Sequence, residues 1–139
     1  MNPDDWTWVL GIPVLVPFAG AAFTLLLARA PAAQRVVSLV ALTIVLLDAV
    51  FIGFLSLRGP LILDVGGWAA PVGITLVADR LSALMLMVSV FVTLCVLVYS
   101  FTQDLAENQR LPIAVFQPTF LILSAGVSNA FLTGDLFNL

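Results

Sequence analysis

Four apolar runs, each long enough to cross a lipid bilayer, constrain this chain more than any other feature of its sequence. They occupy about residues 8–28, 36–57, 80–101 and 113–133. The hydrocarbon core of a bilayer is roughly 30 Å thick, and about 20 residues of α-helix span it. Because lipid offers the backbone no hydrogen-bond partners, each run has to pair its own peptide groups, as a helix does. The sequence therefore predicts an all-α transmembrane fold, with four membrane-spanning helices in one membrane domain that covers residues 1–139.

The scarcity of charged residues supports this prediction and excludes several kinds of chemistry. Only 9% of the residues are charged and 62% are hydrophobic, whereas soluble domains carry about 25% charged residues. All five cationic residues are arginines, so the chain has no lysine for a Schiff base and no histidine for base catalysis or metal binding. We therefore expect no cofactor, no metal site and no nucleic-acid partner. The single cysteine, Cys95, lies inside an apolar run and is expected to be buried.

The connections between the apolar runs differ in length and character. The first is short, so the first two helices are predicted to form an antiparallel pair. The second contains two extended segments, residues 61–65 and 74–77, on either side of a turn rich in glycine and proline. This pattern predicts a short extramembrane β-hairpin over about residues 60–78. Asp79, just before the third helix, is placed to cap its first turn.

The fourth apolar run contains a proline, and a short apolar segment follows the run. Pro118 is typical of a first helical turn, which would leave residues 113–117 as a lead-in to the fourth helix. Residues 136–139 look like the opening of a fifth helix, so we expect the chain to be part of a longer polypeptide.

The arginines suggest an orientation in the membrane. Arg29, Arg35 and Arg110 fall on one side of the predicted helices, and Arg58 and Arg80 fall on the other. Since cytoplasmic loops carry the excess of positive charge, the N-terminus is predicted to lie outside.

Asp48 is the sharpest candidate for a functional residue, because it lies well inside the second apolar run with no cation near it in sequence. A carboxyl group inside a membrane is costly and marks a functional site by default. It could belong to a proton or cation path. It could also be a neutral structural group that is hydrogen-bonded to Thr43 or to a neighbouring helix. The sequence leaves both interpretations open.

The fourth apolar run carries small and hydroxyl residues at helical spacing. Ser124 and Ser128 are one turn apart, as are Gly126 and Ala130. Such residues let membrane helices approach closely and hydrogen-bond, although a polar track along a proton path is the alternative. Asp135 follows at a turn, where it is either a turn former or a carboxylate at a cation entrance.

Three stretches resemble a known family. Residues 66–74 (GGWAAPVGI), 77–85 (VADRLSALM) and 129–139 (NAFLTGDLFNL) are similar to the D-type subunit of the Mrp multisubunit Na⁺/H⁺ antiporters. The wider family includes the antiporter-like subunits of respiratory complex I. The Gly-Gly-Trp hairpin favours the D-type antiporter subunit over those relatives.

The resemblance implies a transporter subunit and not an enzyme. Members of the family have about fourteen transmembrane helices, of which this chain would supply the first four as a scaffold beside the conducting helices. The whole assembly would contain further subunits and would exchange Na⁺, or another monovalent cation, for protons across a bacterial plasma membrane. The family's relay glutamate on helix five and its later lysines would lie beyond Leu139, and Glu107 does not match that motif.

The sequence is also compatible with two other functions. One is a proton-pumping membrane subunit of an NADH dehydrogenase or a related hydrogenase. The other is a small structural or assembly protein of the membrane that functions alone.

Overall fold

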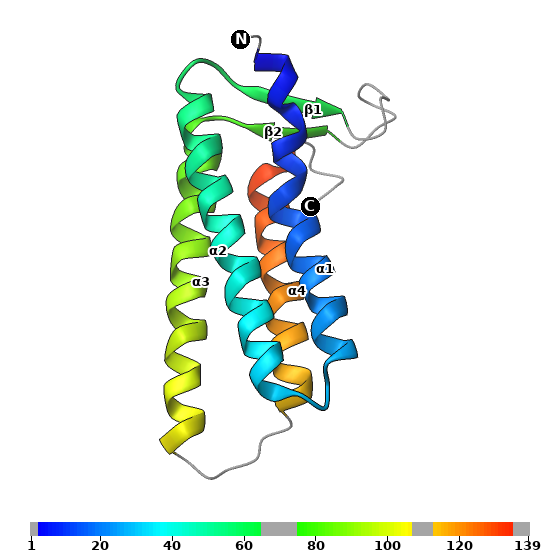
Figure 1. Cartoon of the computed structure of the whole chain (residues 1–139). Helices are drawn as coiled ribbons and strands as arrows, with labels where there is room; N and C mark the ends of the chain where they lie inside the picture. Colours follow the sequence, from blue (N-terminus) through cyan, green and yellow to red (C-terminus); the bar gives the residue numbers. More distant parts are fainter. Residues whose placement is uncertain (1–2, 65–74, 107–112, 135–139) are drawn as a thin grey trace.

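The chain forms a bundle of four long helices with a short β-hairpin across one end (Figure 1). The structure is a computed structural model that describes the chain except residues 1–2, 65–74, 107–112 and 135–139. Its helices are α1 (Ile12–Leu26), α2 (Pro31–Ser56), α3 (Arg80–Ala106) and α4 (Ile113–Leu132). Within the described residues, four segments are long and apolar enough to cross a membrane, which confirms the predicted number of spans.

The first span starts as a 3₁₀-helix, η1 (Pro3–Gly11), and continues as α1. The change occurs beside Pro13, which lies in the first turn of α1 and is buried. Proline lacks a backbone N–H and has a helical φ, so it suits the first turn of an α-helix. The candidate membrane span covers the end of η1 and all of α1, from Trp6 to Leu26. At its start, the rings of Trp6 and Phe51 form an edge contact with 5.7 Å between their centroids.

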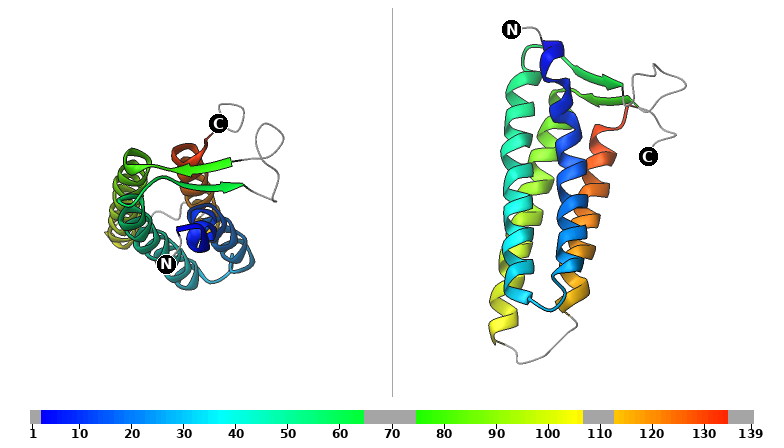
Figure 2. Two further views of the ribbon diagram at one scale, coloured as in Figure 1. Left: turned by 90° about the horizontal axis from the view of Figure 1, so that it is seen from above. Right: turned by 45° about the vertical axis from the view of Figure 1, so that its right-hand side comes forward.

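Successive helices run in opposite directions, so α2 and α4 both point toward the hairpin (Figures 1 and 2). α1 packs mainly against α4 and α2, and α2 also packs against α3. The tight turn between α1 and α2 is held by the side chain of Gln34, whose Nε2 donates to the carbonyl oxygen of Thr24 at 2.7 Å. The guanidinium of Arg35 lies 5.7 Å from the centre of the Phe101 ring and links α2 to α3 near the same end by a cation–π contact.

The hairpin covers one end of the bundle (Figure 2). Strands β1 (Leu61–Asp64) and β2 (Thr75–Ala78) pair antiparallel, with Leu61 opposite Ala78. The three buried hairpin residues, Leu61, Leu76 and Ala78, join a core cluster with residues of η1 and of α2 to α4. A hairpin was predicted in this connection and is confirmed.

The end of α4 docks onto the hairpin. Thr133 forms an isolated bridge with Leu76 of β2, and the backbone N–H of Gly134 donates to the carbonyl oxygen of Thr75 at 2.9 Å. This contact joins two segments that are more than fifty residues apart in the sequence.

The predicted cap of α3 is confirmed. The Asp79 carboxylate accepts a hydrogen bond from the backbone N–H of Ser82 at 2.6 Å. This hydrogen bond, the largest of several contributions, lowers the pKa of Asp79 below its ordinary value. The ionised carboxylate therefore stays available at the positive end of the helix dipole.

Three expectations were wrong. α4 begins at Ile113, so Pro118 lies inside the helix and not in its first turn. Membrane helices tolerate such prolines when neighbouring groups pair with the freed backbone.

Gly126 and Ala130 were expected to let helices approach closely, but they lie on the exposed face of α4, opposite the side that packs in the bundle. Cys95 is also exposed, because α3 buries only a narrow stripe against α2 and α4 and Cys95 lies outside it.

Candidate functional site

Three of the four predicted path residues are buried in the bundle. Asp48 comes from α2, and Ser124 and Ser128 come from α4. Asp135 lies outside the described residues, as does the predicted opening of a fifth helix at 136–139. The candidate site is therefore built from the inner faces of α2 and α4, with α1 beside them.

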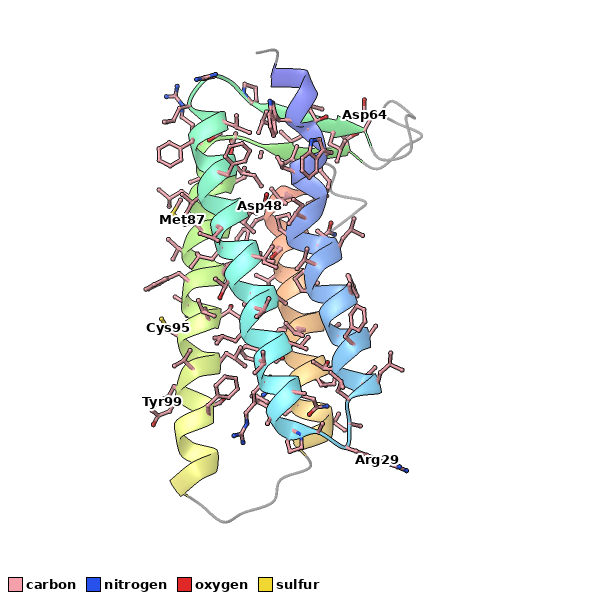
Figure 3. All side chains as sticks on the ribbon, viewed as in Figure 1. Arg29, Asp48, Asp64, Met87, Cys95 and Tyr99 are labelled. Carbon is pink, nitrogen blue, oxygen red and sulfur yellow. The ribbon has the colours of Figure 1, made fainter. Side chains whose placement is uncertain are left out.

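Asp48 lies on the inner face of α2, in the half of the bundle nearer the hairpin (Figure 3). It is eight residues before the end of α2 at Ser56, which is about 12 Å along the helix axis. Its side chain is 8% exposed, and its Oδ2 atom is buried with no hydrogen-bond partner among the described residues. Apolar residues of the upper core, Val45, Ala49 and Ile52, flank it on the same face.

The expected structural partner of Asp48 is engaged elsewhere. The Thr43 hydroxyl is on the exposed side of α2 and donates to the carbonyl oxygen of Leu39 at 2.7 Å. The interpretation in which Thr43 holds a neutral Asp48 is therefore wrong. A buried polar atom without a partner calls for an explanation, such as a bound water, an ion or a functional role.

The two serines of α4 share the buried face of their helix. The Ser128 hydroxyl donates to the Ser124 carbonyl oxygen at 2.8 Å, a bond within the helix that satisfies its proton. The hydroxyl oxygen of Ser128 keeps its capacity to accept a bond. This geometry fits close helix packing, and it also leaves an acceptor facing the interior.

A contact between α1, α2 and α4 shows how far along the bundle Asp48 and Ser128 lie. A Cβ atom added at Gly20 of α1 would lie 3.2 Å from Ala41 Cβ of α2 and 3.2 Å from Leu121 Cδ1 of α4. Asp48 follows Ala41 by seven residues, and Ser128 follows Leu121 by seven residues. Both therefore lie about 10 Å beyond the contact, toward the hairpin. The fold thus brings Asp48 and Ser128 to the same depth.

A second group of buried polar residues lies on the other side of the Gly20 contact, and sequence reasoning missed it. Ser38 precedes Ala41 by three residues and Gln117 precedes Leu121 by four, which places both about 5 Å from the contact. Gln117 is fully buried, and neither its amide nitrogen nor its amide oxygen has a partner among the described residues. The Ser38 hydroxyl is unpartnered in the same sense.

The α2 member of this missed group, Ser38, can be recognised from its helical spacing once the buried face of α2 is known. Gln34 and Ser38 are one turn apart and extend the face that holds Val45 and Asp48. From the sequence, Gln34 is assigned to a connection and Gln117 to the lead-in of the fourth helix, so neither is predicted to be buried. Their burial follows from helices that start earlier than expected.

The two polar groups are separated by apolar contact. Gly20, Ala41 and Leu121 are all buried and pack tightly between them. A water-filled path through the bundle would have to open this contact. The described residues contain no cluster of three or more His, Cys, Asp or Glu side chains that could hold a metal ion. The hairpin-side group, with one carboxyl and two hydroxyls, is suited to hold a proton or water.

Comparison with curated proteins finds related sequences. The chain is 36% identical over 129 residues to the D-type Na⁺/H⁺ antiporter subunit of Alkalihalophilus pseudofirmus, and 32% identical over 129 residues to the D-type Na⁺/H⁺ antiporter subunit of Bacillus subtilis. Each match covers 92% of this chain but only 26% of the relative, so the chain spans about a quarter of the length of these proteins. No protein-family model matches the chain.

A solved structure shares the fold. A chain of the membrane-bound sulfane sulfur reductase, an archaeal respiratory membrane complex, superposes with a TM-score of 0.84 and 25% sequence identity. The match covers 94% of this chain and 27% of that chain. Together with the four apolar helices, these homologues show that the chain is a multi-pass membrane protein. The curated relatives are named as antiporter subunits, which are transporters and not enzymes.

Proposed function

We propose, from the homology of this chain to part of the D-type Na⁺/H⁺ antiporter subunit, that it forms the N-terminal four spans of such a subunit. The homology over 92% of the chain carries the proposal. In this role the bundle is a scaffold that flanks the proton and cation pathway and contacts other subunits of the complex. The tight Gly20 contact supports a scaffold, since Gly20, Ala41 and Leu121 pack between the two buried polar groups.

The proposed location is the plasma membrane of a bacterium, with the N-terminus and the hairpin outside. The arginine count supports this orientation, because the sequence at and beside the connections opposite the hairpin holds three arginines, Arg29, Arg35 and Arg110, and the hairpin end holds two, Arg58 and Arg80. A cysteine placed at exposed Asp64 should react with an impermeant thiol reagent in intact cells. Reaction only in inverted vesicles would reverse the orientation.

The proposed transport is tested by complementation. A bacterium that lacks its own Na⁺/H⁺ antiporters should regain tolerance to Na⁺ when it receives the intact operon. Inverted vesicles from these cells should show a change in ΔpH when Na⁺ is added. Expression of the complex in the membrane with neither salt tolerance nor a Na⁺-dependent ΔpH change would refute the antiport.

A respiratory complex is the second candidate, and the fold match to the sulfane sulfur reductase complex supports it. The genes beside the coding sequence distinguish the two, because flavin and iron–sulfur subunits would accompany a respiratory complex. A free-standing structural protein is the third alternative. Its native subunit would have an intact mass near the 14.8 kDa of this chain, whereas an antiporter subunit would be several times larger.

The Asp48 carboxyl is the group through which this bundle would take part in proton movement. Replacing Asp48 by Asn keeps the size of the side chain and removes its titratable proton. We expect Na⁺-dependent proton exchange in vesicles to fall about tenfold, which corresponds to about 1.4 kcal/mol on the transport barrier. The amount of folded complex in the membrane should stay the same.

Asp64→Asn is the matched control for Asp48→Asn. Asp64 is an exposed carboxyl on β1 that accepts a hydrogen bond from the Thr75 hydroxyl at 3.0 Å, outside the bundle. The Asp64→Asn variant also loses one carboxyl group, and it should leave Na⁺-dependent proton exchange in vesicles unchanged. Equal exchange rates in wild type and Asp48→Asn would assign Asp48 a purely structural role.

A further inference from the structure

The outer surface of the bundle has a groove between α2 and α3, near the hairpin. Its volume is about 340 Å³, and apolar side chains line almost all of it. Its lining includes Gly53, Phe54 and Leu57 from the α2 side and Arg80, Leu84 and Met87 from α3. None of the residues that line the groove belongs to the two buried polar groups.

Gly53 of α2 and Met87 of α3 both line the groove. A Cβ atom at Gly53 would lie 3.4 Å from Met87 Cε, so the two helices are in close contact here and a larger side chain at Gly53 would enter the groove. The rims are exposed, with 66% of Phe54 and 54% of Leu84 accessible. These side chains point away from the bundle at a level where lipid would surround it.

The hairpin end of the groove carries positive charge. Arg80 Nη2 donates to the carbonyl oxygen of Leu57 at 3.2 Å, which fixes the guanidinium at the mouth of the groove. A guanidinium has five N–H donors, so this bond leaves others for a ligand. Exposed Arg58 follows Leu57 directly. The neighbouring carboxylate, Asp79, accepts a hydrogen bond from the N–H of Ser82, and the two arginines outnumber it.

We propose that this groove binds an acyl chain of an anionic phospholipid, with the lipid phosphate held by Arg80 and Arg58. Arginine binds phosphate oxygens through paired hydrogen bonds, and cationic side chains near a membrane surface attract anionic headgroups. A volume of 340 Å³ lies in the range of sites for small organic ligands, about 300–1,000 Å³. The proposal depends on the membrane placement of the helices and not on the proposed antiport.

The test uses the purified complex that contains the full-length subunit, stripped of lipid and titrated with phosphatidylglycerol or phosphatidylcholine. Native mass spectrometry counts the lipids that are bound. Wild type should bind phosphatidylglycerol in preference to phosphatidylcholine. Arg80→Gln keeps a donor but removes the charge, and should weaken phosphatidylglycerol binding about fivefold. Gly53→Leu fills the groove and should remove one bound lipid of either kind per subunit.

Two matched controls keep these variants interpretable. Gly126→Leu adds the same side chain on the exposed face of α4, where nothing lies within 4 Å of an added Cβ. Arg29→Gln removes an exposed arginine at the opposite end of the bundle (Figure 3). Both should bind phosphatidylglycerol like wild type.

Three results would overturn the proposal. One is unchanged phosphatidylglycerol binding in both groove variants, and another is equal binding of the two lipids by wild type. The third comes from a photoreactive side chain placed at Leu84, which should cross-link to lipid in the native membrane. Cross-linking to another polypeptide segment would show that protein occupies the groove.

Discussion

Replacing Gly20 by leucine is expected to destabilise the bundle more than any other single change considered for α1. Even a Cβ atom at this position would lie 3.2 Å from both Ala41 Cβ and Leu121 Cδ1, so three helices meet with no spare room. Overpacking of this kind costs about 3 kcal/mol. We expect the free energy of unfolding, measured by titrating the detergent-solubilised subunit with SDS, to fall by about that amount. Gly20→Ala should cost about 1 kcal/mol, because the neighbours need to move only slightly.

The control for Gly20 is the same substitution at Gly126. Both glycines lie inside membrane-spanning helices, so the gain in helix propensity over glycine, about 0.8 kcal/mol, is common to the two variants. Gly126 faces open space, and Gly126→Leu should be neutral or slightly stabilising. If the two leucine variants unfold at the same SDS concentration, the three-helix contact does not hold the bundle together.

Replacing Gly134 by alanine is expected to detach the end of α4 from the hairpin. An added Cβ would lie 2.6 Å from Val77 Cγ2 and 3.1 Å from the Thr75 carbonyl oxygen. Valine is branched at Cβ and cannot swing its methyl group aside freely. The hydrogen bond from the Gly134 N–H to the Thr75 carbonyl would lengthen or break. We expect a loss of about 2 kcal/mol in stability and faster hydrogen exchange in β2.

A second substitution separates this clash from other effects of alanine. Val77→Ala removes the methyl group that an alanine at position 134 would meet. The double variant should therefore be more stable than the sum of the two single changes predicts, which a double-mutant cycle measures. Strict additivity would mean that the side chains at 77 and 134 do not meet. Unchanged hydrogen exchange in β2 of Gly134→Ala would mean that this contact does not hold the hairpin.

The local features of the fold were predictable because each depends on neighbouring residues alone. Length and hydropathy located the four spans. Two extended runs around a glycine-rich turn located the hairpin, and a carboxyl one residue before a helix located the Asp79 cap. Asp48 stood out as the one carboxyl inside an apolar run, and the structure buries it. Its unpartnered Oδ2 atom follows from packing, and the sequence does not show it.

Hydropathy and turn residues are enough to identify a membrane protein with four helices and a hairpin, and to locate one carboxyl inside a span. Which face of each helix lies inside the bundle depends on how the helices pack together. This packing buries Gln117, turns Gly126 and Cys95 outward, and places Asp48 level with Ser128 beyond the Gly20 contact. The physical reason is that lipid is as apolar as the interior of the bundle. Both faces of a membrane helix are therefore hydrophobic, and the periodicity that reveals the inner face of a soluble helix is absent.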